Sequence, residues 1–334
     1  MKPFVQYFTK RKIILNLCKI RATLADNRSK KHQLHLLTNN TILNYHLYPL
    51  DPQVELLNKI MPPRRKWKKL NKNQRYSSSN QRINTIEYNK AALFKTVLYY
   101  RKQKPNEPFI LELNHFIKSV LSAINDPNYE IDPPEIIPVP KDPVSGQRTI
   151  CRPISHFALK DRIILSITNK YLTDALDQYF YPNSFAFRAS QGGKRVNHHA
   201  SVQNILDYKS KYKGKRLWVS ECDIKKFFDS VHHTIVKKQY QKLIAKLNRD
   251  YPGAFDKRAD GIFKKYLECY TFPKNVLPYN SATAKSKNYW EKHKKPAGEF
   301  GWVEDDLKQL GLFKDVRKAR IGIPQGGALS GLIA

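Results

Sequence analysis

The sequence is short of cysteines and acidic residues and has no long apolar run, and each shortage excludes a class of protein. Its four cysteines include no Cys-x-x-Cys pair, which argues against a disulfide-rich fold and a cysteine zinc site. No run of about 18 apolar residues is present, so we expect no membrane span and no membrane partner. These absences predict a soluble, intracellular protein with free thiols.

The shortage of acidic residues leaves a large positive charge. Sixty Lys and Arg residues stand against 28 Asp and Glu, which gives a formal net charge of +32. A surface with this charge repels itself unless a polyanion neutralises it. Aromatic residues make up 12% of the chain, and aromatic faces stack on unpaired bases while cations track the phosphates. The composition predicts a nucleic-acid partner; a Lys-rich proteome bias and an acidic membrane surface are the alternatives.

Four regions are expected along the chain. Residues 1–85 form a basic, partly flexible extension, whose first 80 residues hold 17 Lys or Arg and three acidic residues. Residues 86–134 carry apolar residues at three- and four-residue spacing, which predicts two helices joined by a proline loop. Two further regions follow at 135–215 and 216–334, the second with a long Lys-rich insertion at about 250–320.

Local patterns in the last two regions indicate an α+β fold. Residues 135–139 and 148–150 read as two strands of a β-hairpin, because the turn signal Asp-Pro-Val-Ser-Gly separates them. Residues 161–175 have the apolar spacing of a core helix. Residues 217–224 are predicted to be a short buried strand, followed by a helix that opens near Asp229 or Ser230, both of which are acceptable caps.

Asp223 is the first candidate for chemistry, because it ends the predicted strand just before the chain turns into a helix. A carboxylate at this edge would stand above an apolar platform, and carboxylate oxygens are the ligands that Mg²⁺ prefers. An aspartate in this position is more often a turn or cap residue. Asp229, six residues on, is expected to be such a helix cap.

Two other features could bind phosphates or nucleic acid. The run Gly-Ile-Pro-Gln-Gly-Gly-Ala-Leu-Ser-Gly at 322–331 lets a backbone approach a ligand closely, and Gln325 projects from its tight turn. On the predicted hairpin, Lys141 and Arg148 could hold a triphosphate between them, with Arg152 as the alternative to Arg148. An ordinary glycine loop and a solvated basic hairpin are the simpler interpretations.

Together these motifs resemble those of reverse transcriptases. Asp-Ile-Lys-Lys-Phe-Phe-Asp at 223–229 is similar to the first catalytic motif of the family, and Pro-Gln-Gly-Gly at 324–327 to the following template–primer motif. Between fingers and palm, the order of three further segments is that of group II intron, retron and phage-defence reverse transcriptases: Arg-Thr-Ile at 148–150, Leu-Lys-Asp-Arg at 159–162, and Tyr-Pro-Asn-Ser-Phe-Ala-Phe-Arg at 181–188.

The resemblance covers roughly residues 135–334 and implies a right-hand polymerase with fingers at 135–215 and a partial palm from 216. It implies an RNA-directed DNA polymerase that uses dNTPs and two Mg²⁺ ions on an RNA template with a DNA or RNA primer. The implied site residues are Asp223 as catalytic metal ligand, the carbonyl of Ile224 as a second ligand, Lys141, Arg148, Phe228 and Gln325 as nucleotide-binding residues, and Pro324, Gly326, Gly327 and Arg188 as template–primer contacts. Phe228 would act as a steric gate against a ribose 2′-hydroxyl.

The sequence departs from this family in three places. No aromatic-x-Asp-Asp motif follows the glycine loop, and Asp305-Asp306 lies before that loop in what reads as a surface helix. The connection from Asp229 to Pro324 is long. Ser330-Gly331 stands where group II intron enzymes usually have Ser-Pro, which favours a defence-associated or otherwise unclassified bacterial reverse transcriptase.

These departures lead us to expect that a downstream segment or a second chain supplies the rest of the palm and the thumb. This chain alone is expected to bind RNA without synthesis. The alternative is a non-catalytic RNA-binding protein, maturase-like or scaffold-like. The expected location is the cytoplasm of a bacterium or, alternatively, an organellar matrix. The sequence leaves open the RNA that is copied, the priming mode, intron mobility against antiphage defence, the oligomeric state, and whether the natural start is Met1 or Met61.

Overall fold

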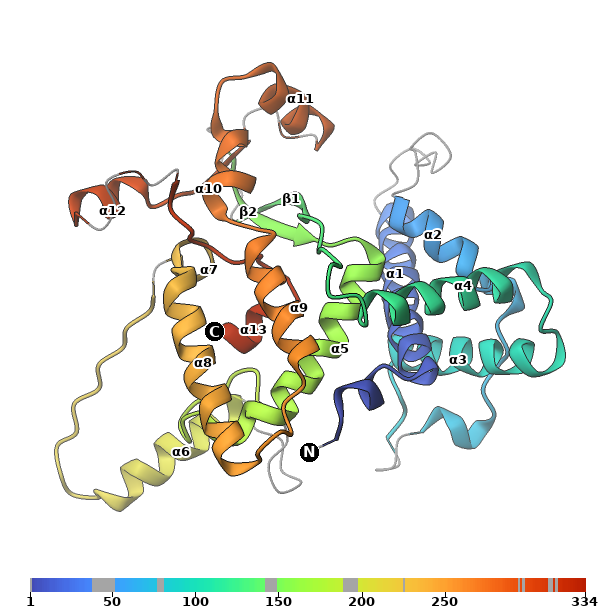
Figure 1. Cartoon of the computed structure of the whole chain (residues 1–334), viewed down its shortest axis with the longest axis horizontal. Helices are drawn as coiled ribbons and strands as arrows, with labels where there is room; N and C mark the ends of the chain where they lie inside the picture. Colours follow the sequence, from blue (N-terminus) through green and yellow to red (C-terminus); the bar gives the residue numbers. More distant parts are fainter. Residues whose placement is uncertain are drawn as a thin grey trace. The chain divides into compact units, whose positions relative to one another are not determined.

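The computed structural model describes residues 2–37, 52–76, 81–141, 149–188, 198–224, 226–293, 295, 298–311, 315 and 318–334. They form an α+β fold, as predicted, divided into two compact units (Figure 1). One unit is Phe8–Asp126, and the other combines Met1–Tyr7 with Pro127–Ala334. No helix in the described ranges is long and apolar enough to span a membrane.

The unit Phe8–Asp126 is helical. Its elements are α1 (Lys10–Leu37), α2 (Pro52–Ile60), η2 (Arg64–Lys66), η3 (Lys72–Arg75), α3 (Thr85–Gln103) and α4 (Pro108–Ala123). Helix α1 packs along α3, and α2 along α4. The Asn84 side chain caps α3 by accepting from the Glu87 N–H, and Pro108 opens α4, where a missing N–H costs no hydrogen bond. The predicted pair of helices joined by a proline loop is therefore confirmed.

A three-stranded sheet lies in the other unit. β1 (Glu135–Pro140) pairs antiparallel with β2 (Thr149–His156), which confirms the predicted hairpin. β3 (Gly298–Phe300) pairs parallel with the other edge of β2. The turn between β1 and β2, which includes Arg148, lies outside the described residues.

The other regular elements of this unit are helices. They are η1 (Phe4–Tyr7), α5 (Leu159–Leu176), η4 (Asp177–Tyr179), α6 (His198–Lys211), α7 (Phe227–Ser230), α8 (His233–Asp250), α9 (Lys257–Glu268), α10 (Phe272–Asn275), η5 (Leu277–Asn280), α11 (Ala284–Lys292), α12 (Glu304–Gln309) and α13 (Ser330–Ile333). The predicted core helix at 161–175 is α5: Ile163, Ile164 and Leu165 are buried, and α8, α9 and η1 pack on it.

The Lys-rich insertion packs onto the β-hairpin. Trp290 and Phe300 share one buried cluster with Ile136 of β1. The Asn280 side chain both accepts from the Phe300 N–H, at 2.8 Å, and donates to the Phe300 carbonyl, at 2.7 Å. The Tyr289 hydroxyl donates to the Ile136 carbonyl at 2.7 Å. The insertion thus adds a strand and an aromatic core to the predicted fingers.

The strand predicted at 217–224 is wrong. This segment has no regular structure, and its apolar side chains are exposed, with Trp218 82% accessible. A strand needs a neighbour for its N–H and C=O groups, and no strand in the described part of the chain pairs with this segment. The expected helix start near Asp229 is also displaced: α8 begins at His233, and the His232 side chain caps it by accepting from the Thr234 N–H at 3.1 Å.

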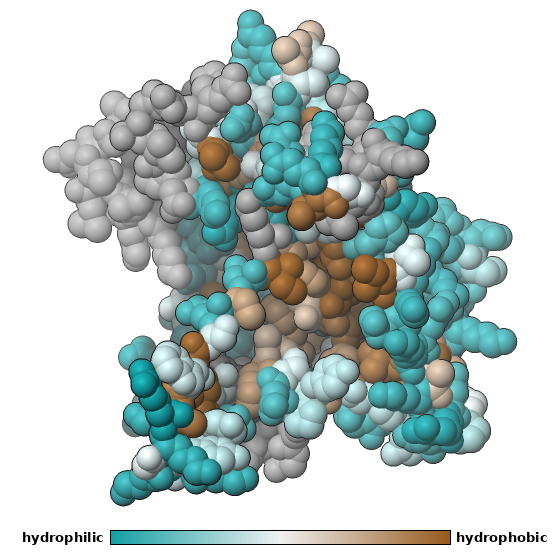
Figure 2. Space-filling view, turned by 90° about the vertical axis from the view of Figure 1, so that its left-hand side faces the viewer, coloured by the Kyte–Doolittle hydropathy of each residue, from teal (hydrophilic) through white to brown (hydrophobic). Residues whose placement is uncertain are grey.

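Apolar surface extends beyond that segment. Figure 2 shows the side of Figure 1 on which α6, α8 and α12 lie; apolar residues gather there in a hollowed centre, and hydrophilic residues surround them. The exposed apolar residues of this unit include Phe187, Val202, Ile205, Leu206, Ile224 and Ile235. An apolar surface of this extent is typical of a site that contacts another protein segment.

Candidate functional site

The two motifs that resemble reverse transcriptase motifs contact one another. The Gln325 side chain donates to Oδ1 of Asp229 at 2.7 Å, across 96 residues of sequence. The Ile323 N–H donates to the Phe228 carbonyl at 2.7 Å, and the Gly322 N–H to the Val231 carbonyl at 2.9 Å. Backbone and side-chain bonds therefore hold the glycine loop against α7.

Asp229 lies at the centre of this contact and is only 1% exposed. Its Oδ2 accepts no hydrogen bond within the described residues, and the Lys226 ammonium lies 3.8 Å away. Burial raises the pKa of Asp229 to about 6, although the Gln325 hydrogen bond and the Lys226 charge act in the opposite direction. The expectation that Asp229 caps a helix is wrong, because its side chain serves the contact between the two motifs.

Lys226 connects the site to the inserted strand. It has a left-handed backbone, with φ 56°, and its ammonium donates to the Gly301 carbonyl at 3.1 Å. Gly301 directly follows β3. The same ammonium thus contacts the insertion and stands near the Asp229 carboxylate. The sequence had predicted a helix cap for Asp229 and no separate role for Lys226.

The glycine loop is also attached to the β-hairpin. The Ser155 N–H of β2 donates to the Gln325 carbonyl at 2.8 Å. Gly322 and Gly326 adopt φ values of 84° and 81°, which side-chain-bearing residues rarely reach. Nε2 of buried His233 donates to the Gly322 carbonyl at 2.7 Å, and burial lowers the pKa of this histidine. Hairpin, loop and α7 therefore form one connected group.

Two later glycines allow close packing. A Cβ on Gly327 would lie 2.4 Å from the Tyr266 hydroxyl oxygen, which in turn is 2.8 Å from Oγ of Ser330. The Ser330 hydroxyl donates to the Pro324 carbonyl. A Cβ on Gly331 would lie 2.5 Å from the Phe187 ring. A side chain at position 331 would therefore clash with the Phe187 ring, and glycine avoids this clash.

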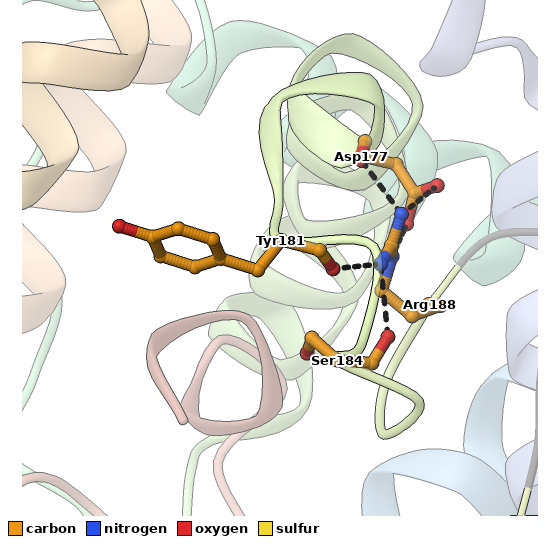
Figure 3. Close-up of polar contacts among 4 residues, drawn as sticks. All are labelled: Asp177, Tyr181, Ser184 and Arg188. Atoms are coloured by element: carbon orange, nitrogen blue, oxygen red, sulfur yellow. Dashed lines mark hydrogen bonds and ion pairs between the residues drawn. The ribbon is translucent and has the colours of Figure 1, made fainter. Parts of the chain in front are cut away.

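Arg188 binds protein groups (Figure 3). Its side chain is 3% exposed, and its Nε donates to Oδ1 of Asp177 at 2.8 Å. Its Nη1 donates to the Tyr181 and Ser184 carbonyls, at 2.9 and 2.8 Å. We had expected a template–primer contact, but these donors are used within the protein. Arg188 fixes a turn from which the Tyr181 ring projects, 86% exposed.

Of the other predicted residues, Phe228 and Pro324 belong to the contact between α7 and the glycine loop. Asp223 and Ile224 are exposed in the segment without regular structure. Lys141 is exposed just after β1, where its backbone N–H donates to the Ile150 carbonyl at 3.0 Å. Further candidates are exposed Arg152 opposite Val139 in the hairpin, half-buried Phe228 with its ring 5.5 Å from that of Phe227, and buried Pro324.

A magnesium site is not complete in the described part of the chain. No group of three or more His, Cys, Asp or Glu side chains there is arranged to hold a metal ion. Asp223 and the Ile224 carbonyl supply one carboxylate and one weaker ligand, whereas Mg²⁺ takes near-octahedral oxygen coordination. Asp305 and Asp306 lie on α12, as the sequence suggested for a surface helix. The residues present do not by themselves fit two Mg²⁺ ions.

A scan of the sequence against protein-family models found no matching family, and a search of curated proteins found no match. The functional assignment therefore depends on the motifs and on the contacts described above.

Proposed function

We propose that this chain is the fingers and front palm of a reverse transcriptase, an RNA-directed DNA polymerase. The observation that carries this proposal is the 2.7 Å hydrogen bond between Gln325 and Asp229, which joins the two family-like motifs. The hairpin expected to grip the incoming nucleotide is attached to the same loop through Ser155. A polymerase needs these three parts around one substrate.

In this proposal, the primer 3′-hydroxyl attacks the α-phosphate of a dNTP and pyrophosphate leaves. Asp223 is the catalytic carboxylate, Lys141 and Arg148 bind the triphosphate, and Phe228 excludes ribonucleotides. Gln325 contacts the nucleotide, while its side chain is oriented by Asp229. When bound, Mg²⁺ would lower the pKa of the attacking hydroxyl and neutralise the leaving group.

The rest of the palm, in this proposal, comes from a downstream segment or a second chain. The exposed apolar segment at 217–224 supports this, because a partner strand would satisfy its backbone groups and cover Trp218. The apolar hollow in Figure 2 also favours such a partner. Pairing would turn 217–224 into the predicted strand and fix Asp223 beside the partner's carboxylates.

The second candidate is a non-catalytic RNA-binding protein, either maturase-like or scaffold-like. It is favoured because, among the described residues of the motif at 223–229, Asp223 is the one carboxylate that is exposed to solvent. One carboxylate does not hold two Mg²⁺ ions. The two candidates share RNA binding and differ in synthesis.

A primer-extension assay tests the proposal. With an RNA template, dNTPs and Mg²⁺, this chain alone should bind RNA without synthesis. After addition of the palm-completing segment or chain, it should extend the primer, and Asp223→Ala should abolish extension. Phe228→Ala should admit ribonucleotides. Asp305→Ala, on α12, is the control and should extend normally; extension by Asp223→Ala at the wild-type rate would remove the active-site assignment.

A further inference from the structure

The connection between α2 and α3 is the most basic described stretch of the unit Phe8–Asp126. Residues 61–76 hold seven Lys or Arg and no acidic residue, and they include η2 and η3. We call residues 61–76 the basic ledge.

The basic ledge is fixed onto α3. The Lys68 N–H donates to Oγ1 of buried Thr96 at 2.8 Å, and the Lys95 ammonium donates to the Lys69 carbonyl at 3.1 Å. Leu70 and Met61 are buried. A reciprocal pair of hydrogen bonds between Asn71 and Gln74 caps η3. The backbone of the ledge is therefore held on α3, which fixes the positions from which its cationic side chains project.

Most of these cations have no acidic partner. Lys66 pairs with Glu107 at 3.0 Å and lies over the Tyr100 and Phe109 rings. In the described ranges, no carboxylate lies within ion-pair distance of the other six, which are Arg64, Arg65, Lys68, Lys69, Lys72 and Arg75. Six unpaired cations held close together repel one another, and a chain of phosphates would relieve that repulsion.

Exposed aromatic rings lie among these cations. The Lys68 ammonium is 3.6 Å from the centroid of the Tyr99 ring, which is 38% exposed. Tyr76, at the end of the ledge, is 45% exposed. Rings that flank a row of cations are typical of surfaces that bind single strands, because bases stack on the rings while cations follow the backbone.

We propose that the basic ledge, with Tyr99, binds an unpaired stretch of RNA. The choice of RNA rather than DNA rests on the proposed function. The ledge belongs to the unit Phe8–Asp126, whereas every residue of the reverse transcriptase-like motifs belongs to the other unit. The ledge therefore contains none of the residues of the proposed template–primer site.

Fluorescence anisotropy with labelled oligouridylate, which forms no stable structure, tests the charge of the ledge. The ledge variant carries Arg65→Gln, Lys69→Gln and Lys72→Gln, since these side chains hold nothing else in place. The control variant removes three exposed charges elsewhere in the same unit, with Lys10→Gln, Lys19→Gln and Lys118→Gln. Both should melt like the wild type.

We expect the ledge variant to bind about 10- to 100-fold more weakly near 100 mM salt, with the slope of log Kd against log salt reduced by about 2. The control should change affinity by less than about threefold. Equal losses in the two variants would overturn the ledge as the site, because they would show that binding follows overall charge.

Tyr99→Leu tests the stacking. It should weaken oligouridylate binding by about fivefold or more without changing the salt slope. Tighter binding to duplex RNA or to oligodeoxyuridylate than to oligouridylate would overturn the choice of single-stranded RNA. The assay contains no dNTP and no primer, so failed primer extension with a normal ledge effect would contradict only the proposed function.

Discussion

At the scale of single residues, Asp229 connects the two motifs through its hydrogen bond with Gln325, but its buried charge lowers the stability of the folded protein. Its carboxylate is buried, and Oδ2 makes no hydrogen bond in the described part of the chain. Buried, incompletely bonded charges destabilise proteins, and they persist mainly where a function needs them. The pKa of about 6 makes this effect measurable.

We predict that Asp229→Asn changes how stability depends on pH. Since folding raises the Asp229 pKa from its ordinary value to about 6, the folded state holds this proton more tightly. The stabilising contribution is present below about pH 4 and is lost as pH rises through about 6, a difference of about 3 kcal/mol. Asn keeps an acceptor for Gln325 but no charge. Urea unfolding from pH 4 to 7 should therefore show the variant gaining stability relative to wild type; a constant difference would contradict a raised pKa. Asp305→Asn is the control.

A second prediction concerns Gly327. Gly327→Ala would place a Cβ 2.4 Å from the Tyr266 hydroxyl oxygen, and we expect destabilisation of about 1–3 kcal/mol. In a Tyr266→Phe background the added loss should be smaller, because the clashing oxygen is gone. Gly261→Ala, on α9 with open space around it, should instead stabilise by up to about 1 kcal/mol. Thermal unfolding of the four variants checks the cycle, and an undiminished loss in the Phe background would argue against this clash.

Site residues could be predicted from the sequence where neighbouring residues carry the signal. The tight glycine turn around Gln325 could be predicted because its signal is contiguous. The part played by Asp229 could not be, since its hydrogen-bond partner is 96 residues away, and a local reading favours a helix cap. The buried state of Arg188 escaped notice for the same reason, because Asp177 lies before a turn whose shape the sequence does not define.

At the scale of elements, the turn after η4 depends on one guanidinium. We predict that Arg188→Lys destabilises the protein by about 1–3 kcal/mol, because an ammonium cannot reproduce the fork of hydrogen bonds that the buried guanidinium donates to Asp177, Tyr181 and Ser184. Limited proteolysis should then cut near Tyr181. Arg249→Lys, in an exposed pair with Asp250, should change stability by less than about 0.5 kcal/mol. A loss for Arg188→Lys as small as that expected for Arg249→Lys would show that the Arg188 bonds are dispensable.

Elements were predictable where their signal is local. The helices α3, α4 and α5 have the 3.6-residue apolar repeat, and the hairpin has a turn signal between apolar strands. The segment 217–224 has the composition of a strand, but a strand exists only with a neighbour. β3 was missed for the converse reason: its three residues are a strand only because β2 lies beside them.

At the scale of the whole molecule, the net charge of +32 should make stability depend on salt. We predict that raising NaCl from about 20 to about 300 mM increases Tm, because a shorter Debye length weakens the repulsion between cations. Oligouridylate should raise Tm at low salt and have little effect near 1 M salt. Differential scanning fluorimetry gives both results, with sucrose as the uncharged control. A Tm that is indifferent to salt would mean that the cations are too dispersed to repel one another.

The exposed segment at 217–224 also provides an optical probe. The Trp218 side chain is largely exposed to solvent, whereas Trp290 is buried within the hydrophobic cluster that includes Phe300. Replacing Trp67, Trp290 and Trp302 by Phe would leave Trp218 as the single indole of the chain. Its emission should then shift to shorter wavelength, and its quenching by iodide should fall, when a second strand covers the segment. A segment that pairs with residues 217–224 can thus be detected by titration, from the emission wavelength of Trp218.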